Sequence, residues 1–296
     1  MSAQPTMVRR DAAHVRTAPT RPTRTAHGIP GRAGQLVAAL GDRADVHGAC
    51  DEVGSGILAD LSDHEMQEIR AVLRVVFGLD GPVLDLAAGL GRLTIPLLAL
   101  RREVTALDLS GEMLERLERR LHQAPEALRL RCSTVQTDMS DFSLGRQFAA
   151  IVLGGSSIAL LDEVSRAGLY RSVRRHLTPD GRFLVSTIDH GAALLPPEVG
   201  TELRAPSGRN YRVYDYWEPG APTWTLTALP ADSSRGPVTV CTTTQRVLSG
   251  DQLQIELERA GLQVLSRTVV SEGRTRQPVV LIEASLPRHA ALPNFG

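Results

Sequence analysis

At 296 residues, of which 42% are hydrophobic, the chain can bury one large α/β core and an insertion, but hardly two full domains of equal size. Its formal net charge is zero, so no field of the whole protein favours nucleic acid or an anionic membrane surface. All 33 basic residues are arginines, and the lack of lysine excludes a lysine Schiff base and the lysine of a phosphate-binding P-loop.

The three cysteines, Cys50, Cys132 and Cys241, lie far apart and form no CxxC pair. We therefore expect neither a disulfide framework nor a bound metal. No apolar run approaches the ~20 residues that a membrane span needs, and the arginines near the N-terminus precede no apolar signal core. We expect a cytoplasmic protein that contacts neither a membrane nor nucleic acid.

The beginning of the chain is rich in arginine and proline and shows little hydrophobic periodicity. We expect residues 1–43 to form a basic, mostly disordered arm, with a short apolar piece at 35–40 beginning the ordered part. From Ser62, a capping residue with Glu65 three positions later, the spacing predicts a helix. Its apolar positions, among them Met66, Ile69 and Phe77, should pack on a sheet.

Residues 83–92, Val-Leu-Asp-Leu-Ala-Ala-Gly-Leu-Gly-Arg, are typical of a nucleotide-binding turn. A short apolar strand ends at Asp85, and a helical pattern begins directly after Gly91. Glycine permits a tight bend and a close approach of ligand to backbone, which a Cβ would obstruct. Asp108 ends the next predicted strand, 104–108, where its carboxylate can accept both hydroxyls of a ribose.

Three more strands are predicted at 130–136, 148–153 and 182–189, the last after a helix over 162–177 and a turn at 179–181. This alternation of strands and helices predicts a doubly wound sheet. Ligands in such a sheet bind beyond the carboxyl ends of the strands. The residues expected at that rim are Asp85, Asp108, Asp138, Gly154, Asp189 and His190.

Residues 191–247 change to short segments of period two, separated by proline and glycine, which predicts an antiparallel insertion. The aromatic side chains of Tyr214, Tyr216 and Trp217 lie in it. They could wall an acceptor pocket beside the rim, although packing within the strands explains them about as well.

The chain then returns to the core with a helix over 249–261 and two strands, 262–270 and 279–284. Because the link at 271–277 is too short for a helix, these strands must pair as an antiparallel hairpin. We therefore expect a core made of 44–190 and 248–285, and a loose tail over 286–296.

A dinucleotide site wants a third glycine where this chain has Thr94, so the glycine turn alone is a weak signal for NAD. The motif Asp85-x-Ala87-x-Gly89-x-Gly91, with Asp108, Asp138-Met139 and the terminal hairpin, resembles a class I S-adenosylmethionine-dependent methyltransferase. The resemblance covers about 62–190 and 248–285, with Ala87 in place of the usual first glycine. It implies a seven-stranded Rossmann-like α/β sheet with a β-rich insertion.

The resemblance also implies roles for single residues. The turn from Asp85 to Gly91, including Ala87 and Gly89, would hold the methionine part of S-adenosyl-L-methionine. The resemblance further implies contacts with the rest of the cofactor, or of its product S-adenosyl-L-homocysteine. Asp108 and Leu109 would lie at the ribose, and Met113, Asp138 and Met139 at the adenine. Leu153 and Gly154 would lie at the sulfonium.

The rim after the fourth strand reads Gly154-Gly155-Ser156-Ser157. It lacks the Asn/Asp-Pro-Pro-aromatic segment of nucleobase amine methyltransferases, the metal-binding acid of catechol-type enzymes and the paired glutamates of arginine methyltransferases. What remains is metal-independent transfer to a small molecule or peptide end. The run 91–100, together with the insertion at 211–217 and the segment 249–261, further resembles natural-product N-methyltransferases, most of all those that dimethylate a C-terminal amine of daptide-type ribosomal peptides. Related enzymes often have a tyrosine ahead of the capped helix, near the carboxylate of the cofactor, whereas residues 47–51 of this chain contain none.

An amine acceptor must arrive neutral, and His190 or Asp189 at the rim is placed to remove its proton. Ser156, Tyr214, Tyr216 and Trp217 would line the acceptor pocket, the aromatic rings attracting a cationic amine. An O-methyltransferase, a non-catalytic subunit that binds S-adenosylmethionine and a nicotinamide dehydrogenase stay open as alternatives. The sequence also leaves open the number of methyl groups transferred and whether the protein forms a homo-oligomer.

Overall fold

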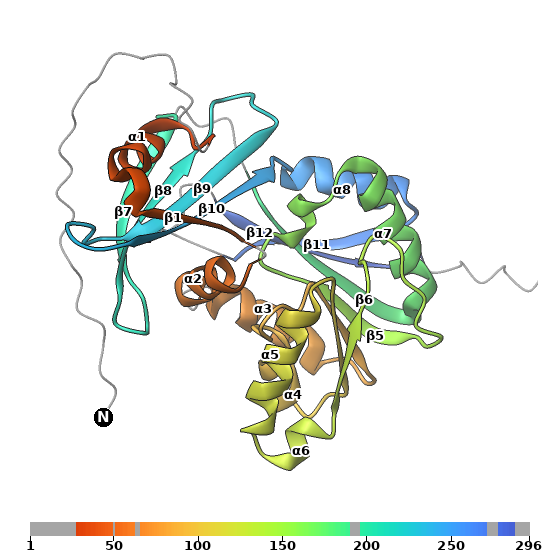
Figure 1. Ribbon diagram of the computed structural model, residues 1–296. Coiled ribbons are helices and arrows are strands. Elements are labelled where there is room, and N and C mark those ends of the chain that lie inside the picture. Colours follow the sequence, from red (N-terminus) through yellow and green to blue (C-terminus); the bar gives the residue numbers. More distant parts are fainter. Residues whose placement is uncertain (1–27, 50, 63–65, 190–195, 271–277, 288–296) are drawn as a thin grey trace, which may run out of the picture.

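The computed structural model describes residues 28–49, 51–62, 66–189, 196–270 and 278–287. They form two sheets, one of seven strands and one of five. Figure 1 shows the five-stranded sheet with helix α1 on one side of the molecule and the seven-stranded sheet with its helices on the other.

The seven-stranded sheet has the order β11-β12-β6-β5-β2-β3-β4. From β6 to β4 the neighbours are parallel, whereas β12 is antiparallel to both β6 and β11. The doubly wound, Rossmann-like sheet and the terminal hairpin are thereby confirmed. The strands are β2 (Val83–Leu86), β3 (Val104–Asp108), β4 (Cys132–Gln136), β5 (Phe148–Leu153), β6 (Leu177–Ile188), β11 (Gln263–Val269) and β12 (Val279–Ser285).

Helices cover both faces of this sheet. One face carries α3 (Met66–Phe77), α4 (Thr94–Ala99) and α5 (Gly111–His122), whose apolar side chains form one core with residues such as Val104 and Val152. The other carries α7 (Glu163–His176) and α8 (Gly250–Arg259), which pack on residues such as Phe148 and Phe183. The short helices α6 (Glu126–Arg129) and η2 (Ser157–Leu160) follow α5 and β5.

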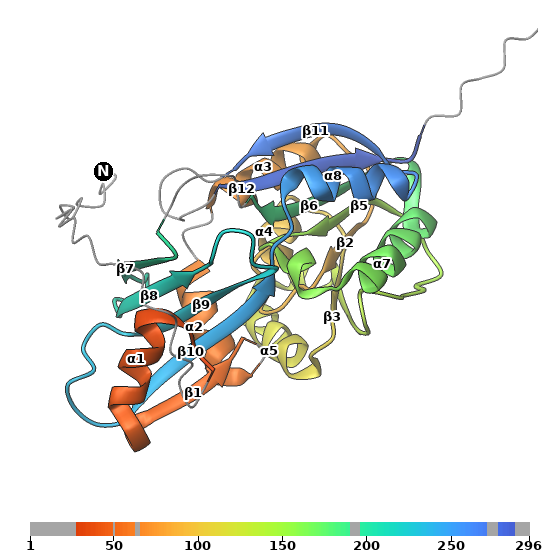
Figure 2. The same cartoon turned by 90° about the horizontal axis from the view of Figure 1, so that it is seen from above.

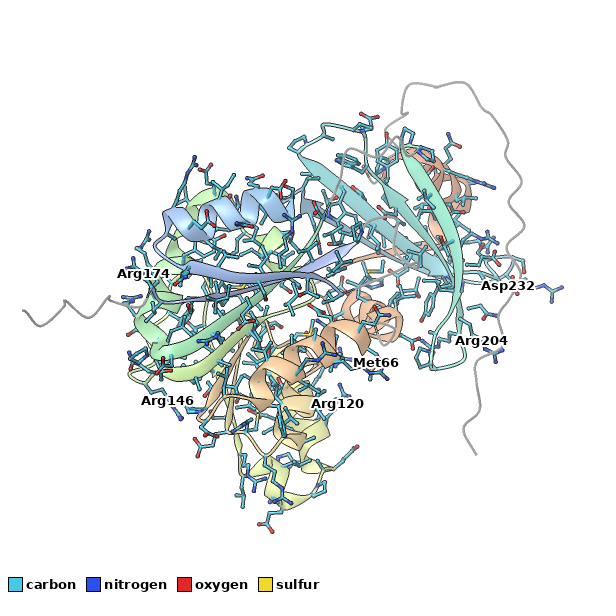
Figure 3. The ribbon with its side chains drawn as sticks, turned by 180° about the vertical axis from the view of Figure 1, so that it is seen from behind. Met66, Arg120, Arg146, Arg174, Arg204 and Asp232 are labelled. Atoms are coloured by element: carbon cyan, nitrogen blue, oxygen red, sulfur yellow. The ribbon has the colours of Figure 1, made fainter. Side chains whose placement is uncertain are left out.

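The five-stranded sheet has the order β1-β10-β9-β8-β7, and only β1 and β10 are parallel. Its strands are β1 (Ala44–Gly48), β7 (Glu198–Arg204), β8 (Asn210–Tyr216), β9 (Thr223–Pro230) and β10 (Val238–Arg246). Helices α1 (Gly31–Leu40) and α2 (Glu52–Ser62) pack on its two faces, with η1 (Gly41–Arg43) after α1 (Figure 2). Figure 3 shows Arg204 and Asp232 of this sheet at the opposite end of the molecule from Arg146 and Arg174 of the core.

The expected N-terminal boundaries are wrong in part. Residues 1–27 lie outside the described residues, but 28–43 include α1 and η1 instead of belonging to a disordered arm. Strand β1, which we expected in the seven-stranded core, pairs with β10 through Ala44 and Val238. The five-stranded sheet thus combines the insertion with the beginning of the chain.

The structure differs from the predicted elements in three further places. Ser62, where we expected the next helix to start, is the last residue of α2, and the following helix α3 is described from Met66, since 63–65 lie outside the described residues. Phe77 is 74% exposed at the end of α3 rather than packed on the sheet. The turn expected at 179–181 is an irregular stretch within β6, where the register against β5 shifts between Phe148 and Ala150. Among the described residues, no helix is long and apolar enough to cross a membrane.

Candidate functional site

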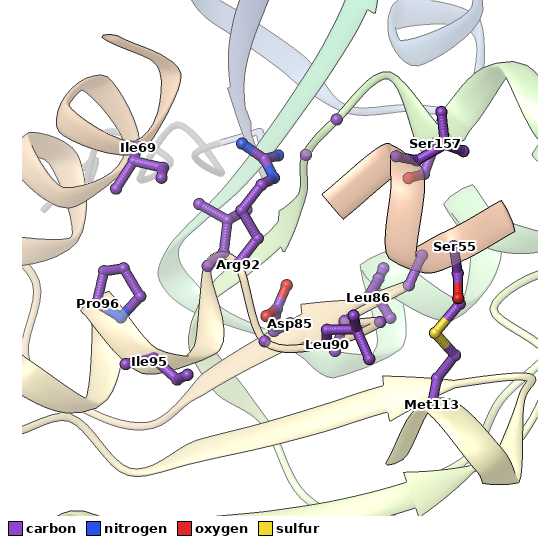
Figure 4. A pocket seen from close by; sticks show the side chains of 18 of the residues that line it. Ser55, Ile69, Asp85, Leu86, Leu90, Arg92, Ile95, Pro96, Met113 and Ser157 are labelled. Atoms are coloured by element: carbon purple, nitrogen blue, oxygen red, sulfur yellow. The ribbon is translucent and has the colours of Figure 1, made fainter. Parts of the chain in front are cut away.

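A cavity of about 450 Å³ lies at the carboxyl ends of the strands of the large sheet, a volume within the range of small-molecule sites. The glycine turn after β2, the rim after β5 and helices α2, α3 and α5 line it. Figure 4 shows Asp85 below the middle of the pocket, with Arg92 above it and with Ser55 and Met113 on one side of the view. The cavity is where the doubly wound topology places a ligand.

The glycine turn presents its backbone to the cavity. Ala87, Gly89 and Gly91 have φ values of 51°, 53° and 85°, all in the left-handed region. The turn is fastened at Ala88, whose N–H donates to the Leu107 carbonyl at 3.0 Å and whose carbonyl accepts from the Gly91 N–H at 2.9 Å. A Cβ at Gly91 would collide with the Leu117 side chain. Glycine is therefore required there, whereas Ala87 adopts its conformation under strain.

Asp108 at the tip of β3 joins that turn to the next helix. Its Oδ2 accepts from the Gly89 N–H at 2.8 Å, and its Oδ1 accepts from the Ser110 N–H at 2.9 Å. Ser110 in turn caps helix α5 by accepting from the Met113 N–H at 3.3 Å. The carboxylate thus fixes the positions of the glycine turn and of Met113, which lines the cavity.

Asp85 lies under the turn, 2% exposed. The Thr94 hydroxyl donates to its Oδ2 at 2.6 Å. Burial raises the pKa of Asp85 to about 7, against the opposing effects of the Thr94 hydrogen bond and the Arg92 charge. Thr94 stands where a dinucleotide-binding fold needs glycine. Here its hydroxyl group binds the buried carboxyl group of Asp85.

An ion pair between a half-buried arginine and a buried glutamate joins the residue after the glycine turn to the rim after β5. Arg92 Nη2 lies 2.7 Å from Glu68 Oε2. Glu68 comes from α3 and is 2% exposed, and its Oε1 accepts from the Gly155 N–H at 3.0 Å. One carboxylate therefore contacts both the residue after the glycine turn and the backbone after β5.

Helix α2 closes the cavity from the side of the second sheet. Ser55 and Leu58, three residues apart and so on one face of the helix, line the cavity. Asp51 holds the beginning of the helix: its carboxylate accepts from the N–H groups of Gly48 and Gly54, each at 2.7 Å. A segment without a helical pattern in the sequence thus supplies one wall of the site.

Comparisons with known proteins agree with this geometry. A family model of a methyltransferase domain matches residues 83–181. The glycopeptide N-methyltransferase MtfA, in a crystal structure with sinefungin, is 38% identical, with 90% of this chain and 100% of that chain covered and a TM-score of 0.65. The chain belongs to the S-adenosylmethionine-dependent methyltransferases.

Two other solved methyltransferases share the fold at lower identity. The CcbJ methyltransferase from Streptomyces caelestis is 18% identical over 74% of this chain and 89% of that chain, with a TM-score of 0.63. The sugar N-methyltransferase KedS8 from Streptoalloteichus sp is 22% identical over 75% and 87%, with a TM-score of 0.54. No protein among the curated sequences matches.

The described residues fit the cofactor of this family. The left-handed turn leaves backbone open to the cavity, and the Asp108 carboxylate stands at the tip of the neighbouring strand. The expected cofactor residues that line the cavity are Asp85, Ala87, Gly89, Gly91, Met113 and Gly154.

The other expected cofactor residues of this methyltransferase, Asp108 among them, are not on the lining of the cavity. Leu109 is 68% exposed, and Leu153 is fully buried in the core. Asp138 is exposed, with Oδ1 accepting from the Ser140 N–H at 2.7 Å, and Met139 packs against the core below the rim. Contacts of Asp138 and Met139 with adenine stay predictions.

Of the two residues expected to act as a base, Asp189 does not line the cavity. His190 lies outside the described residues. Asp189 is bound elsewhere: its Oδ2 lies 2.5 Å from Arg267 Nη2, and its Oδ1 accepts from the Gly250 N–H at 3.4 Å. These contacts join the end of β6 to β11 and to the start of α8, which favours a structural role for Asp189.

The aromatic residues expected in the acceptor pocket are packed within the second sheet. Tyr214 is 4% exposed, in a cluster with Ile29 and Val37 on the α1 side of that sheet. The Tyr216 hydroxyl donates to Glu218 at 2.6 Å, and Trp217 is 6% exposed. None of the three lines the 450 Å³ cavity. Packing, the alternative that the sequence left open, describes Tyr214 correctly.

Ser156, expected in the same pocket, is buried at the rim in a left-handed conformation with φ 57°. Its neighbour Ser157 lines the cavity instead. Sequence reasoning missed Ser55, Glu68 and Arg92. For Glu68 a signal existed, since it lies four residues before the buried Val72 and thus on the apolar face of α3. A carboxylate on such a face needs a partner.

Proposed function

We propose that this methyltransferase transfers methyl groups from S-adenosyl-L-methionine to an amine of a small natural product or a modified peptide. The observation that carries the proposal is the match to the glycopeptide N-methyltransferase MtfA, 38% identical with the whole of that chain covered. Among the described residues, no group of three or more histidine, cysteine, aspartate or glutamate side chains could hold a metal ion. The role that we propose for the protein is to position the acceptor against the methyl group of the cofactor.

When bound, the cofactor supplies a methyl group on a sulfonium, which an acceptor lone pair displaces in line. The protein must hold the acceptor within ~3 Å of that methyl group and keep water away. Helix α2 covers the cavity through Ser55 and Leu58, and Ser157 faces it from the rim. These hydroxyl-bearing and apolar residues form the surface against which an uncharged amine would be placed.

The acceptor that we propose more narrowly is a C-terminal amine of a ribosomal peptide, which would receive two methyl groups. The support is the resemblance of residues 91–100 to natural-product N-methyltransferases of the daptide type. A peptide end fits a cavity that the methyltransferase core and helix α2 line together, since the remainder of the peptide can extend along the outside of the protein.

The test compares three short peptides that differ only at the C-terminus: an amine, a hydroxyl or the ordinary carboxylate. Each is incubated with S-adenosyl-L-methionine and analysed by mass spectrometry for added methyl groups. We expect one and then two methyl groups on the amine peptide only. Methylation of the hydroxyl peptide in its place would contradict the amine proposal. Calorimetry that shows binding of S-adenosyl-L-homocysteine, with no turnover of any peptide or small amine, would indicate a non-catalytic subunit.

A further inference from the structure

We propose that Glu68 is a positioning residue for methyl transfer, because its single buried carboxylate holds the cofactor turn and the acceptor rim in one geometry. The inference rests on the proposed transfer to an acceptor at this rim. It concerns a residue on α3, outside the motif that identifies the cofactor site, and it assigns Glu68 no contact with the reacting atoms.

Glu68 joins three elements of the site. The side chain extends from α3, is 3% exposed, and contacts the Arg92 guanidinium at 2.7 Å, directly after the glycine turn. Both of its oxygens lie within hydrogen-bonding distance of the Gly155 N–H, at 3.0 Å and 3.3 Å. Arg92 and Gly155 both line the cavity, and a Cβ built at Gly155 would lie 3.2 Å from Arg92 Nη2, so this carboxylate holds the residue after the glycine turn against the rim after β5.

The rim that Glu68 holds has an unfavourable backbone. Gly155 and Ser156 have φ values of 63° and 57°, so two successive residues are left-handed. Residues other than glycine rarely adopt this conformation, and it persists only where the surroundings fix it. Three consecutive N–H groups are fixed here: that of Gly155 by Glu68, that of Ser156 by the Ser186 hydroxyl at 3.2 Å, and that of Ser157 by the Gly154 carbonyl at 3.2 Å.

The ion pair also presses directly on the rim. A Cβ built at Gly154 would lie 2.8 Å from Arg92 Nη2 and 3.1 Å from Glu68 Oε1. The ion pair therefore lies directly against the rim backbone, where it limits the positions open to Gly154 and Gly155. Because methyl transfer is in line, a displacement of the rim by ~1 Å is enough to lower the rate strongly.

Stability alone is a weak reason for this ion pair. Buried ion pairs cost desolvation, and replacing one with apolar side chains of similar volume is often neutral or stabilising. The chain contains a second buried pair that serves as a comparison: Arg166 on α7 binds Glu256 on α8 through two hydrogen bonds of 2.7 Å. That pair joins two helices on the far face of the sheet and contacts no residue of the cavity lining.

The experiment compares Glu68→Gln with the matched control Glu256→Gln in the full-length enzyme. For Glu68→Gln we expect kcat to fall by roughly 100-fold, with the acceptor KM and the Kd for S-adenosyl-L-homocysteine each within about threefold of the wild type, since no contact to either ligand is removed. Glu68→Asp should recover part of kcat, because it keeps the charge for Arg92. Glu256→Gln should lower the melting temperature and leave kcat unchanged.

A readout without acceptor separates this inference from the proposed function. With S-adenosyl-L-homocysteine bound, hydrogen exchange of the Gly155 amide should accelerate by roughly tenfold or more in Glu68→Gln, and stay at the wild-type rate in Glu256→Gln. If no acceptor is methylated by the wild type, the proposed function fails while exchange still decides the role of Glu68. If Glu68→Gln does not fold, Glu68→Asp is measured in its place. Unchanged exchange at Gly155, or equal losses of kcat in both glutamine variants, overturns the inference.

Discussion

The carboxylate of Asp108 accepts a hydrogen bond from the N–H of Gly89 at 2.8 Å, joining the tip of β3 to the glycine turn after β2. The second oxygen holds Ser110, the cap of α5. The ends of two neighbouring strands of the sheet are thus joined through this carboxylate. A cofactor whose ribose reaches this carboxylate would meet a site that needs little reorganisation.

We expect Asp108→Ala to weaken binding of S-adenosyl-L-homocysteine by roughly 10- to 100-fold, because hydrogen bonds to a charged group are each worth about 1.5–3 kcal/mol. Isothermal titration calorimetry measures the effect. Asp80→Asn serves as the control, since Asp80 is fully exposed in the loop before β2, at the other end of the strands. Equal affinities for wild type and Asp108→Ala would contradict the ribose assignment.

Asp85 should make stability depend on pH. Burial raises its pKa from 3.8 in the unfolded chain to about 7 in the folded protein, so between these values the folded state binds more protons. The free energy of unfolding therefore falls as pH rises through this window and levels off above it, by on the order of 4 kcal/mol in all. Asp85→Asn lacks this titration.

Urea unfolding of both proteins at several pH values between 4 and 8 tests this expectation. The stability of Asp85→Asn relative to the wild type should increase steadily with pH across the window. Parallel curves would show that the folded and unfolded states titrate Asp85 alike, and would contradict the raised pKa.

The cofactor side of this site is encoded locally. The strand ending at Asp85, the turn through Gly89 and Gly91 and the helix that follows lie within about 20 residues, and each has its own period or turn signal. The hairpin of β11 and β12 follows from the shortness of its link. Such features depend on neighbours in the chain, so the sequence was sufficient to predict them.

The acceptor side is not encoded locally. Helix α2 contains Gly54 and Gly56, each of which lowers helix propensity by about 1 kcal/mol, and it is stabilised by packing on the second sheet. Strand β1 pairs with β10 through Ala44 and Val238, which are far apart in the chain. No pattern within either segment reveals such a partner.

The aromatic residues illustrate a different limit. Alternation correctly predicted the strand around Tyr214 and Tyr216, but period two is the same for both faces of a sheet. Which face turns to the core depends on the helices on each side. Helix α1 covers the face of Tyr214, and because the sequence did not reveal this helix, pocket lining and strand packing stayed open as alternatives for Tyr214.

Replacing Ala87 and Gly91 should have opposite effects on stability. Ala87 has φ 51°, and Ala87→Gly removes strain of about 1 kcal/mol, partly offset by the greater entropy of glycine in the unfolded chain. We expect a small rise in melting temperature and unchanged affinity for S-adenosyl-L-homocysteine. Gly91→Ala would place a methyl group against Leu117 and should destabilise by more than about 1 kcal/mol. Thermal unfolding measures both.

If Ala87→Gly lowers the melting temperature by as much as Gly91→Ala does, the left-handed conformation at Ala87 is not under strain. If it instead changes ligand affinity, the methyl group of Ala87 contacts the ligand, and the alanine in place of the usual first glycine has a role in binding.

The last prediction decides between a base and a structural role for Asp189. Its ion pair with Arg267 and its contact with the Gly250 N–H join β6, β11 and α8. We expect Asp189→Asn to reduce the free energy of unfolding by up to about 1 kcal/mol and to leave kcat within about twofold. Loss of a general base would instead cost roughly 100-fold or more.

Asp251→Asn is the matched control, because Asp251 also pairs with Arg267 but lies exposed on α8. Both variants should show similar small losses of stability and the same dependence of kcat/KM on pH as the wild type. A loss of turnover in Asp189→Asn alone, together with the loss of one limb of its pH profile, would establish Asp189 as the base. His190→Ala, assayed in parallel, tests whether the imidazole of the next residue accepts the proton. If it does, His190→Ala abolishes that limb of the pH profile while the ion pair of Asp189 with Arg267 is retained.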